Sequence, residues 1–392
     1  MMKRIISLLL VFVIVFALTG CNSKIVADEP LDMSVAMVTD SGDITDQSFN
    51  QTTYEAAKAW CEENDANFNY YHPDGDDVDH RVASVDQAVK DGYNIILLPG
   101  NAFGATIVRV AEKYPDVKFI LLDVSKDDIL AAAFERDSKE YDYNTDHWNI
   151  DDFVDISNVY SAIYHEELSG YMAGYAAVML GYENLGYIGG KAVPAVIRYG
   201  YGYIQGADDA ARELEKQVTV TYGYCNQFLA DDRITVVMND WYLRGVEVIF
   251  SCGGGIWESV AKAASVNHKK LIGVDVDQKG IVDSTYGEGL IVTSAMKGLG
   301  ATVTSTLDKI KGGFWEALAG NIATLGIVST TDPTANYAQL PIDSTEFEEG
   351  KFTLHDYYTL IADMRSDKLI ISSSIDAFPT TTNVTIDDKG DV

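Results

Sequence analysis

Residues 33–51, MSVAMVTDSGDITDQSFNQ, decide the fold, because an apolar run ends there at an aspartate and a polar turn leads into a helix. The run 33–39 has the length of a buried strand, Asp40 follows it, and 48–63 continues with helical spacing. A buried strand followed at once by a helix is the first half of a βαβ unit, the unit that builds parallel sheets. The stretch therefore predicts an α/β fold with polar side chains at its first turn.

The same alternation continues along the chain in two blocks. In the first block we predict strands at 67–71, 94–98 and 118–122 and a helix at 78–90. In the second we predict strands at 184–188, 218–222, 246–250 and 270–274, with helices at 164–180, 195–216, 232–244 and 256–266. Strands of continuous Val, Ile and Leu indicate parallel sheets covered by helices on both faces. A chain of 392 residues has room for two such doubly wound lobes.

The predicted lobes interleave along the chain. The first comprises 33–126 and 290–320, because a further strand and helix in the later segment would return to it. The second comprises 158–289 and 321–392, and it ends in a helix at 352–364 and a polar tail. Residues 127–157 are rich in acids and lack periodicity, so we interpret them as a surface insert that carries the first crossing between the lobes.

The N-terminus has the features of an export signal. Lys3 and Arg4 precede an apolar run at 5–18, which is shorter than the roughly 20 residues of a spanning helix. The run ends in LTGC at 18–21, which resembles the lipobox of bacterial lipoproteins, where cleavage leaves the cysteine as a lipidated first residue. We expect residues 1–20 to be removed, Cys21 to anchor the protein outside the cell membrane, and 21–32 to form a tether. The alternative is an ordinary signal peptide with an incidental cysteine.

Charge and cysteine content exclude several classes of protein. Beyond the signal segment 27 bases face 59 acids, a net charge of −32, which excludes nucleic acid as a partner. Cys61, Cys225 and Cys252 are odd in number and lack metal-site spacing, so we expect buried thiols and no disulfide framework.

No motif for catalysis or metal binding is complete. His165 begins a helix like that of zinc proteases, but Ser169 stands where the second histidine must be. No G-x-S-x-G stretch occurs, which weakens a hydrolase interpretation. We therefore expect no catalytic residues, no metal and no cofactor.

Three of the predicted strands end in an aspartate, namely Asp40, Asp123 and Asp275. In open parallel sheets the ligand crevice lies outside the carboxyl ends of the strands. Each aspartate alone could be a helix cap or a turn former. Their recurrence in both blocks favours a polar site between the lobes.

From Asp40 the sequence DSGDITDQSFN resembles the basic membrane protein family of solute-binding lipoproteins, which includes the purine nucleoside receptor of ABC importers. The resemblance spans nearly the whole mature chain. It continues in order through FILLD (119–123), ELSGYMAG (167–174), IGG (188–190), YGYIQG (201–206), CGGG (252–255), IGVDVDQ (272–278) and TSAMK (293–297).

The resemblance implies a type I periplasmic-binding-protein fold, in which two lobes joined by three crossing segments close on a nucleoside and deliver it to an ABC permease. It also implies a set of ligand contacts. These are polar groups on Asp40, Asp46 and Asn50, an aromatic face on Phe49, a carboxylate on Asp123 near the base edge, and ribose contacts from Asp275 and Lys297.

The sequence departs from the family at the second aromatic wall. Tyr199, Tyr201 and Tyr203 stand where the family tends to have phenylalanine, and we take Tyr203 as the ligand contact. Trp257 is either a second wall or plain helix core. Gly253 and Gly254 either let backbone approach the ligand or form a tight turn. The acidic insert has no counterpart in the family pattern.

These observations predict a membrane-anchored solute-binding protein of an ABC importer that captures nucleosides, purine nucleosides in particular, and catalyses no reaction. Two alternatives remain open at this point. One is a surface lipoprotein for interaction or adhesion on the same fold, and the other is a nucleoside-cleaving enzyme, since clustered aspartates and a ribose site would also serve that chemistry.

Overall fold

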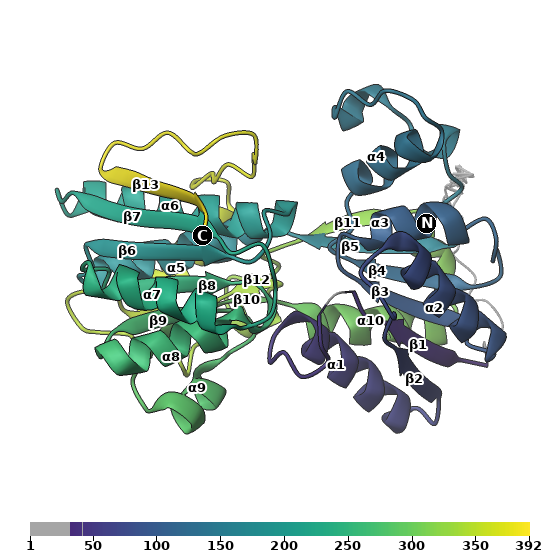
Figure 1. Cartoon of the computed structure of the whole chain (residues 1–392), viewed down its shortest axis with the longest axis horizontal. Helices are drawn as coiled ribbons and strands as arrows, with labels where there is room; N and C mark the ends of the chain where they lie inside the picture. Colours follow the sequence, from purple (N-terminus) through teal and green to yellow (C-terminus); the bar gives the residue numbers. More distant parts are fainter. Residues whose placement is uncertain (1–31, 41) are drawn as a thin grey trace, which may run out of the picture.

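Two lobes lie side by side along the long axis of the molecule in the computed structural model, which describes residues 32–40 and 42–392 (Figure 1). Each lobe is a sheet with helices on both faces, so the predicted pair of doubly wound α/β lobes is confirmed. The predicted signal segment 1–20, Cys21 and almost all of the predicted tether lie outside the described residues. No helix in the described ranges is both long enough and apolar enough to cross a membrane.

The first lobe contains a six-stranded parallel sheet in the order β11-β5-β4-β3-β1-β2. Its strands are β1 (Ser34–Val38), β2 (Asn67–Tyr71), β3 (Ile95–Pro99), β4 (Lys118–Leu122), β5 (Val159–Tyr164) and β11 (Ile322–Leu325). Its helices are α1 (Phe49–Glu63), α2 (Val78–Lys90), α3 (Phe103–Val110), α4 (Lys126–Arg136) and α10 (Leu299–Lys311). One core lies beneath α2, α3 and α4 and a second beneath α1 and α10, which explains why β3 is buried along its whole length.

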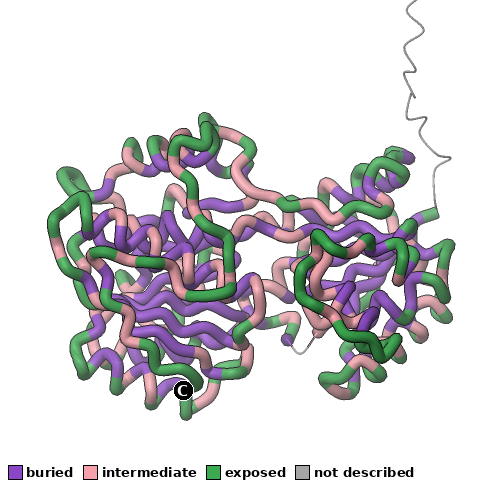
Figure 2. Tube along the Cα trace, turned by 90° about the horizontal axis from the view of Figure 1, so that it is seen from above, coloured by how far each residue is buried: buried purple, intermediate pink, exposed green. Residues whose placement is uncertain are grey.

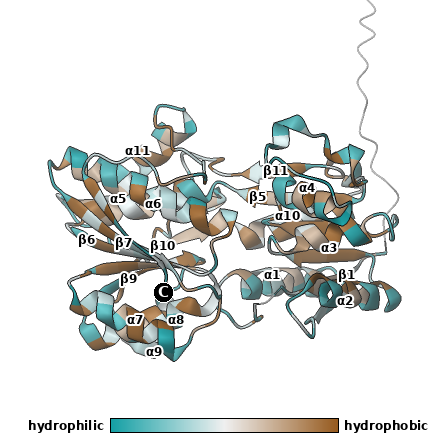
Figure 3. Cartoon of the chain, turned by 45° about the horizontal axis from the view of Figure 1, so that its top comes forward, coloured by the Kyte–Doolittle hydropathy of each residue, from teal (hydrophilic) through white to brown (hydrophobic). Residues whose placement is uncertain are grey.

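The second lobe contains a seven-stranded sheet in the order β12-β10-β9-β8-β6-β7-β13, parallel except where β12 meets β10. Its strands are β6 (Asn184–Gly189), β7 (Val218–Tyr224), β8 (Val248–Cys252), β9 (Lys270–Asp275), β10 (Ile291–Lys297), β12 (Ala338–Gln339) and β13 (Val384–Asp391). Its helices are α5 (Glu166–Met179), α6 (Pro194–Glu213), α7 (Asp232–Leu243), α8 (Trp257–Asn267), α9 (Lys279–Tyr286) and α11 (Leu354–Arg365). Figure 2 shows buried strands through the middle of both lobes, and Figure 3 shows hydrophobic colouring on several of the strands.

The chain passes between the lobes three times, between β5 and α5, between β10 and α10, and between β11 and β12. Three of our boundaries were wrong. β5 pairs with β4 in the first lobe, although we had placed 158 onward in the second. β10 pairs with β9 in the second lobe, although we had returned it to the first. β11 pairs with β5 in the first lobe, although we had placed 321 onward in the second. The side chains of these strands would fit either sheet, so their pattern does not reveal which sheet each one joins.

The insert 127–157 is neither a plain loop nor a crossing. It begins with α4, whose first turn is fixed by a capping box between Ser125 and Asp128. Phe134 then packs against Tyr141 and Phe153, with ring centroids 5.0 and 4.5 Å away. Acidic residues on the outer face of this short helix interrupt its apolar periodicity, so the sequence pattern did not predict the helix.

The polar tail also differs from our expectation, because residues 384–391 form the edge strand β13 beside β7. The Asp208 side chain fixes its start by accepting hydrogen bonds from the backbone N–H groups of Thr382, Asn383 and Val384. This carboxylate replaces the backbone partners that the chain lacks as it enters the sheet.

Helices α5 and α6 pack so closely that their backbones touch. This contact fixes the position of α6 relative to the carboxyl ends of the strands. A Cβ atom added to Gly170 would lie 2.1 Å from the Tyr199 carbonyl oxygen, and one added to Gly174 would lie 2.1 Å from that of Tyr203. Gly202 faces the Glu167 carbonyl oxygen equally closely. The glycines of the two helical motifs therefore serve close packing, which places Tyr199 rigidly at the cleft.

Candidate functional site

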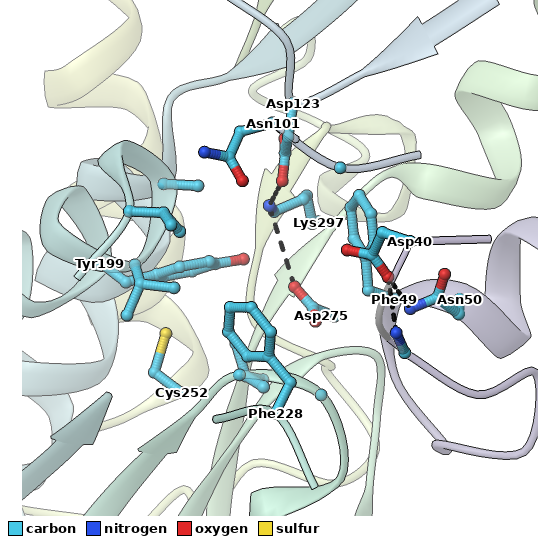
Figure 4. Close-up of a pocket in the computed structure, with 18 residues that line it drawn as sticks. Asp40, Phe49, Asn50, Asn101, Asp123, Tyr199, Phe228, Cys252, Asp275 and Lys297 are labelled. Carbon is cyan, nitrogen blue, oxygen red and sulfur yellow. Dashed lines mark hydrogen bonds and ion pairs between the residues drawn. The ribbon is translucent and has the colours of Figure 1, made fainter. Parts of the chain in front are cut away.

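The carboxyl ends of strands from both lobes meet around one cavity (Figure 4). It contains about 640 Å³ of space free of atoms, including solvent at its mouth. The first lobe contributes residues that follow β1, β3 and β4, and the second contributes residues at or after the ends of β8, β9 and β10: Asp40, Gly100, Asn101, Asp123, Gly253, Asp275 and Lys297.

Most of the residues named from the sequence line this cavity: Asp40, Phe49, Asn50, Asp123, Gly253, Gly254, Asp275 and Lys297. Asp123 and Asp275 both leave their strands in the left-handed backbone region, with φ angles of 60° and 65°. Aspartate tolerates this region better than most residues, and such backbone strain clusters at functional sites. The backbone therefore turns both carboxylates out of the sheets at the cavity.

Asp46 does not line the cavity. Its carboxylate accepts hydrogen bonds from the backbone N–H groups of Ser48 at 2.9 Å and of Asn50 and Gln51 at 3.1 Å. It thus caps the N-terminus of α1, and the Ser48 hydroxyl takes no part in this cap. Burial raises the pKa of Asp46 to about 6, although these three amide hydrogen bonds act in the opposite direction. Asp46 holds the turn that carries Phe49.

Trp257 and Tyr203 are also absent from the cavity wall. Trp257 is 2% exposed, and its Nε1–H donates to the Asp46 carbonyl oxygen at 3.0 Å across the lobe boundary. Tyr203 is fully buried in the second lobe, with its ring centroid 5.4 Å from that of Phe250. It lies one helical turn beyond Tyr199 along α6, and Tyr199 is the tyrosine that reaches the cavity.

Segment 46–48 docks against the second lobe through two further hydrogen bonds. The Ser48 hydroxyl donates to Asp275 Oδ2 at 2.6 Å, and Gln278 Nε2 donates to the Gln47 carbonyl oxygen at 3.0 Å. Together with the Trp257 contact, these bonds join the lobes beside the cavity. We call this set of contacts the latch.

Aromatic rings from both lobes border the cavity. Phe49, from the first turn of α1, is half-buried and also packs against the first-lobe core. Tyr199 and Phe228 come from the second lobe, Phe228 on the loop after β7 (Figure 4). Sequence reasoning missed Phe228, because no periodicity or motif marks that loop.

Gly253 and Gly254, which we assigned to the ligand, make room for Phe228 together with Gly190. A Cβ atom added to Gly190 would lie 2.4 Å from its ring, and one added to Gly253 would lie 2.9 Å from it. Gly253 and Gly254 have φ angles of 139° and 51°, so any side chain there would be strained as well. The glycine run 253–255 was the one sequence signal that pointed to a bulky neighbour.

A buried charge network forms one side of the cavity. Lys297 Nζ lies 2.6 Å from Asp123 Oδ2, 3.3 Å from Glu166 Oε1 and 4.0 Å from Asp275 Oδ1. Glu166 also pairs with Arg198 at 2.6 Å. No signal in the sequence pointed to Glu166 and Arg198, which lie behind the cavity wall.

The network holds Lys297 charged and leaves the aspartates costly to ionise. Burial lowers the pKa of Lys297, but Asp123, Glu166 and Asp275 together raise it above its usual value. Burial raises the pKa of Asp123 to about 7 in spite of Lys297, and burial likewise raises the pKa values of Asp40 and Asp275. Among the lining residues, three aspartate side chains face a single ammonium group, that of Lys297.

Three buried polar atoms on the cavity wall have no hydrogen-bond partner among the described residues: Asn50 Oδ1, Asp123 Oδ1 and the Tyr199 hydroxyl. Buried polar groups are rarely left unpaired in native proteins, so these atoms indicate where a ligand binds. Asn50 Oδ1 can only accept, and Asp123 Oδ1 can only accept once the carboxylate is ionised beside Lys297. The cavity therefore suits a ligand rich in hydrogen-bond donors.

Comparison with known proteins agrees with this geometry. The sequence model of the Bmp family, described as an ABC transporter substrate-binding protein that is PnrA-like, matches residues 33–332. The chain belongs to the Bmp family. Proteins of this family are substrate-binding components, which bind a small molecule and deliver it to an ABC permease, and the resemblance noted in the sequence is confirmed.

Two relatives and one solved structure illustrate the similarity of this Bmp protein to others. The ABC transporter nucleoside-binding protein BmpA of Lactococcus lactis is 25% identical over 333 residues, covering 80% of this chain and 86% of the relative. An uncharacterized lipoprotein of Pyrococcus abyssi is 24% identical over 332 residues, covering 82% and 73%. A solute-binding protein of an Aeropyrum pernix ABC transporter has a TM-score of 0.63 at 19% identity, covering 86% and 87%, and shares the fold.

Proposed function

We propose that this Bmp protein captures nucleosides, purine nucleosides foremost, between its lobes and delivers them to the permease of an ABC importer. One observation carries the proposal: the cavity combines aromatic rings from both lobes with carboxylates and unpartnered acceptors. A nucleoside matches both the aromatic rings and the acceptors, since its base is flat and apolar on its faces and its sugar carries hydroxyl donors.

The contacts divide between base and sugar. Phe49 offers a face to the base, and stacking of a base on an aromatic ring contributes about 1 to 3 kcal/mol in single-strand binders. Asp123 Oδ1, which lacks a partner, accepts from an N–H on the base edge. Asp275 accepts from ribose hydroxyls, and hydrogen bonds to a carboxylate are roughly twice as strong as neutral ones. Asp40 and Asn50 complete the polar wall of the first lobe.

The delivery step follows from the two-lobed design. Ligand contacts come from both lobes, so a bound nucleoside stabilises the arrangement in which the lobes meet, and the latch adds to it. The permease then recognises that arrangement.

We further propose that lipid on Cys21 anchors the protein outside the cell membrane. The sequence LTGC at 18–21 supports this, as does the name of the Pyrococcus abyssi relative. Mass spectrometry of the protein from membranes tests it: a diacylglyceryl group on an N-terminal Cys21 is expected, and an unmodified Cys21 within a longer chain would contradict it.

A thermal-shift screen of nucleosides, free bases, sugars and nucleotides tests the nucleoside proposal. Nucleosides are expected to raise the melting temperature, because a ligand that binds only the folded state stabilises it. An interaction or adhesion module would give no response to any of them. Release of free base from inosine during incubation would instead indicate a nucleoside-cleaving enzyme.

A further inference from the structure

Of the three unpartnered atoms on the cavity wall, the Tyr199 hydroxyl is the one to which the sequence assigned no role. Tyr199 is 2% exposed, and its hydroxyl oxygen is buried with no hydrogen-bond partner among the described residues. Figure 4 shows the hydroxyl pointing into the cavity, toward the side where Lys297 and Asp275 lie.

Close packing surrounds the backbone and the ring of Tyr199. Its backbone carbonyl lies against Gly170 of α5, so that even a Cβ atom there would approach it to 2.1 Å. The ring packs edge to face on Phe250 with centroids 5.8 Å apart, and Lys297 Nζ lies 5.5 Å from the ring centroid. A buried hydroxyl held in this way gains a partner only when a ligand supplies one.

The charges around this hydroxyl keep it a donor. Burial and the carboxylates of Asp275, Glu166 and Asp123 raise the pKa of Tyr199 far above its usual value. The hydroxyl therefore stays protonated, and its O–H requires an acceptor.

Asp275 offers the matching acceptor nearby. Its Oδ2 atom is taken by the Ser48 hydroxyl, while Oδ1 lies 4.0 Å from Lys297 Nζ and accepts no hydrogen bond from the described residues. A ligand group between Tyr199 and Asp275 must accept from one side and donate to the other. A hydroxyl does both, whereas a base N–H only donates and a base carbonyl only accepts.

We propose that Tyr199 is a specificity-determining residue that donates a hydrogen bond to a ribose hydroxyl of the ligand, while that same hydroxyl donates to Asp275. The inference rests on the proposed nucleoside function and deepens it, because it makes the site selective for ribonucleosides over deoxynucleosides at one position of the sugar.

The test is calorimetric titration of the full chain, purified in mild detergent, with inosine, 2′-deoxyinosine and 3′-deoxyinosine. Tyr199→Phe keeps the ring and removes the hydroxyl. The affinity for inosine is expected to fall about three- to tenfold, the usual effect of losing one hydrogen bond. One of the two deoxynucleosides is expected to bind the parent more weakly and to lose nothing further in the variant, because it lacks the hydroxyl that Tyr199 contacts.

Tyr203→Phe is the matched control. Tyr203 also has a buried hydroxyl without a partner among the described residues and also packs on Phe250, but it does not line the cavity. Its variant is expected to bind all three ligands like the parent.

Two results with the variant would overturn the inference while leaving nucleoside binding intact. One is an equal loss for all three ligands in Tyr199→Phe, which would place the hydroxyl at the base or in the packing. The other is no loss for any of them. Failure of the parent to bind any nucleoside would overturn the proposed function together with this inference. Equal affinity of the parent for inosine and both deoxynucleosides would overturn the inference alone, and this result needs no variant.

Discussion

Replacement of Phe49 by alanine tests whether its ring binds the ligand or only stabilises the fold. Phe49 is half-buried, since part of it packs on the first-lobe core and part lines the cavity. A fully buried phenylalanine costs about 3 to 5 kcal/mol when truncated, so we expect about 1 to 2 kcal/mol for this partly buried one in the unliganded protein. Loss of stacking should weaken inosine by about 1 to 3 kcal/mol, or about 5- to 150-fold.

The assay pairs chemical denaturation without ligand with calorimetric titration of inosine. Phe68→Ala is the matched control, because Phe68 also lies half-buried against the first-lobe core but does not line the cavity. It should lose similar stability and bind inosine normally. A large loss of stability in Phe49→Ala with unchanged affinity would refute the reasoning, since Phe49 would then support the fold alone.

Three further predictions concern residues around the cavity. Trp257→Phe removes the hydrogen bond to the Asp46 carbonyl oxygen across the lobes. Ligand affinity should therefore fall about two- to tenfold in titrations, and the radius of gyration of the unliganded protein should increase in small-angle X-ray scattering. An unchanged radius of gyration together with unchanged affinity would contradict the role of the latch. Asp46→Ala removes the acceptor of three amide hydrogen bonds and should cost about 1 to 2 kcal/mol of unfolding free energy in denaturation, whereas a neutral effect would speak against the cap. Burial raises the pKa of Asp123 from 3.8 to about 7, so its contribution to stability is present in acid and is lost as the pH rises through 7. Asp123→Asn should therefore gain stability relative to the parent between pH 4 and pH 7, and a constant difference over that range would show that Asp123 stays ionised.

The aspartates at the strand ends could be predicted from the sequence because two simple rules apply to them. Apolar runs mark parallel strands, and ligands bind at the carboxyl ends of such strands, so Asp40, Asp123 and Asp275 could be placed together before any coordinates. The family resemblance added Phe49 and Lys297, which the structure also places on the cavity wall.

The rest of the site depends on packing that the sequence does not encode locally. Tyr199 and Tyr203 lie four residues apart on one helix face, so only the docking of α6 on α5 decides which reaches the cavity. Phe228 lies on a loop without periodicity. Asp46 could have been assigned as a helix cap, because an aspartate ahead of a helix is a common N-terminal signal, but the match to the family motif led us to the ligand instead.

The central claim is that this cavity binds a nucleoside, and comparison of inosine with inosine monophosphate tests it most directly. Among the described residues that line the cavity, three carboxylates face one ammonium group, which Asp123 already pairs at 2.6 Å, so a phosphate would meet an excess of negative charge there. Calorimetric titration should show saturable binding of inosine and at least about 100-fold weaker binding of the monophosphate. Comparable affinity for the two, or no binding of inosine at all, would contradict the account.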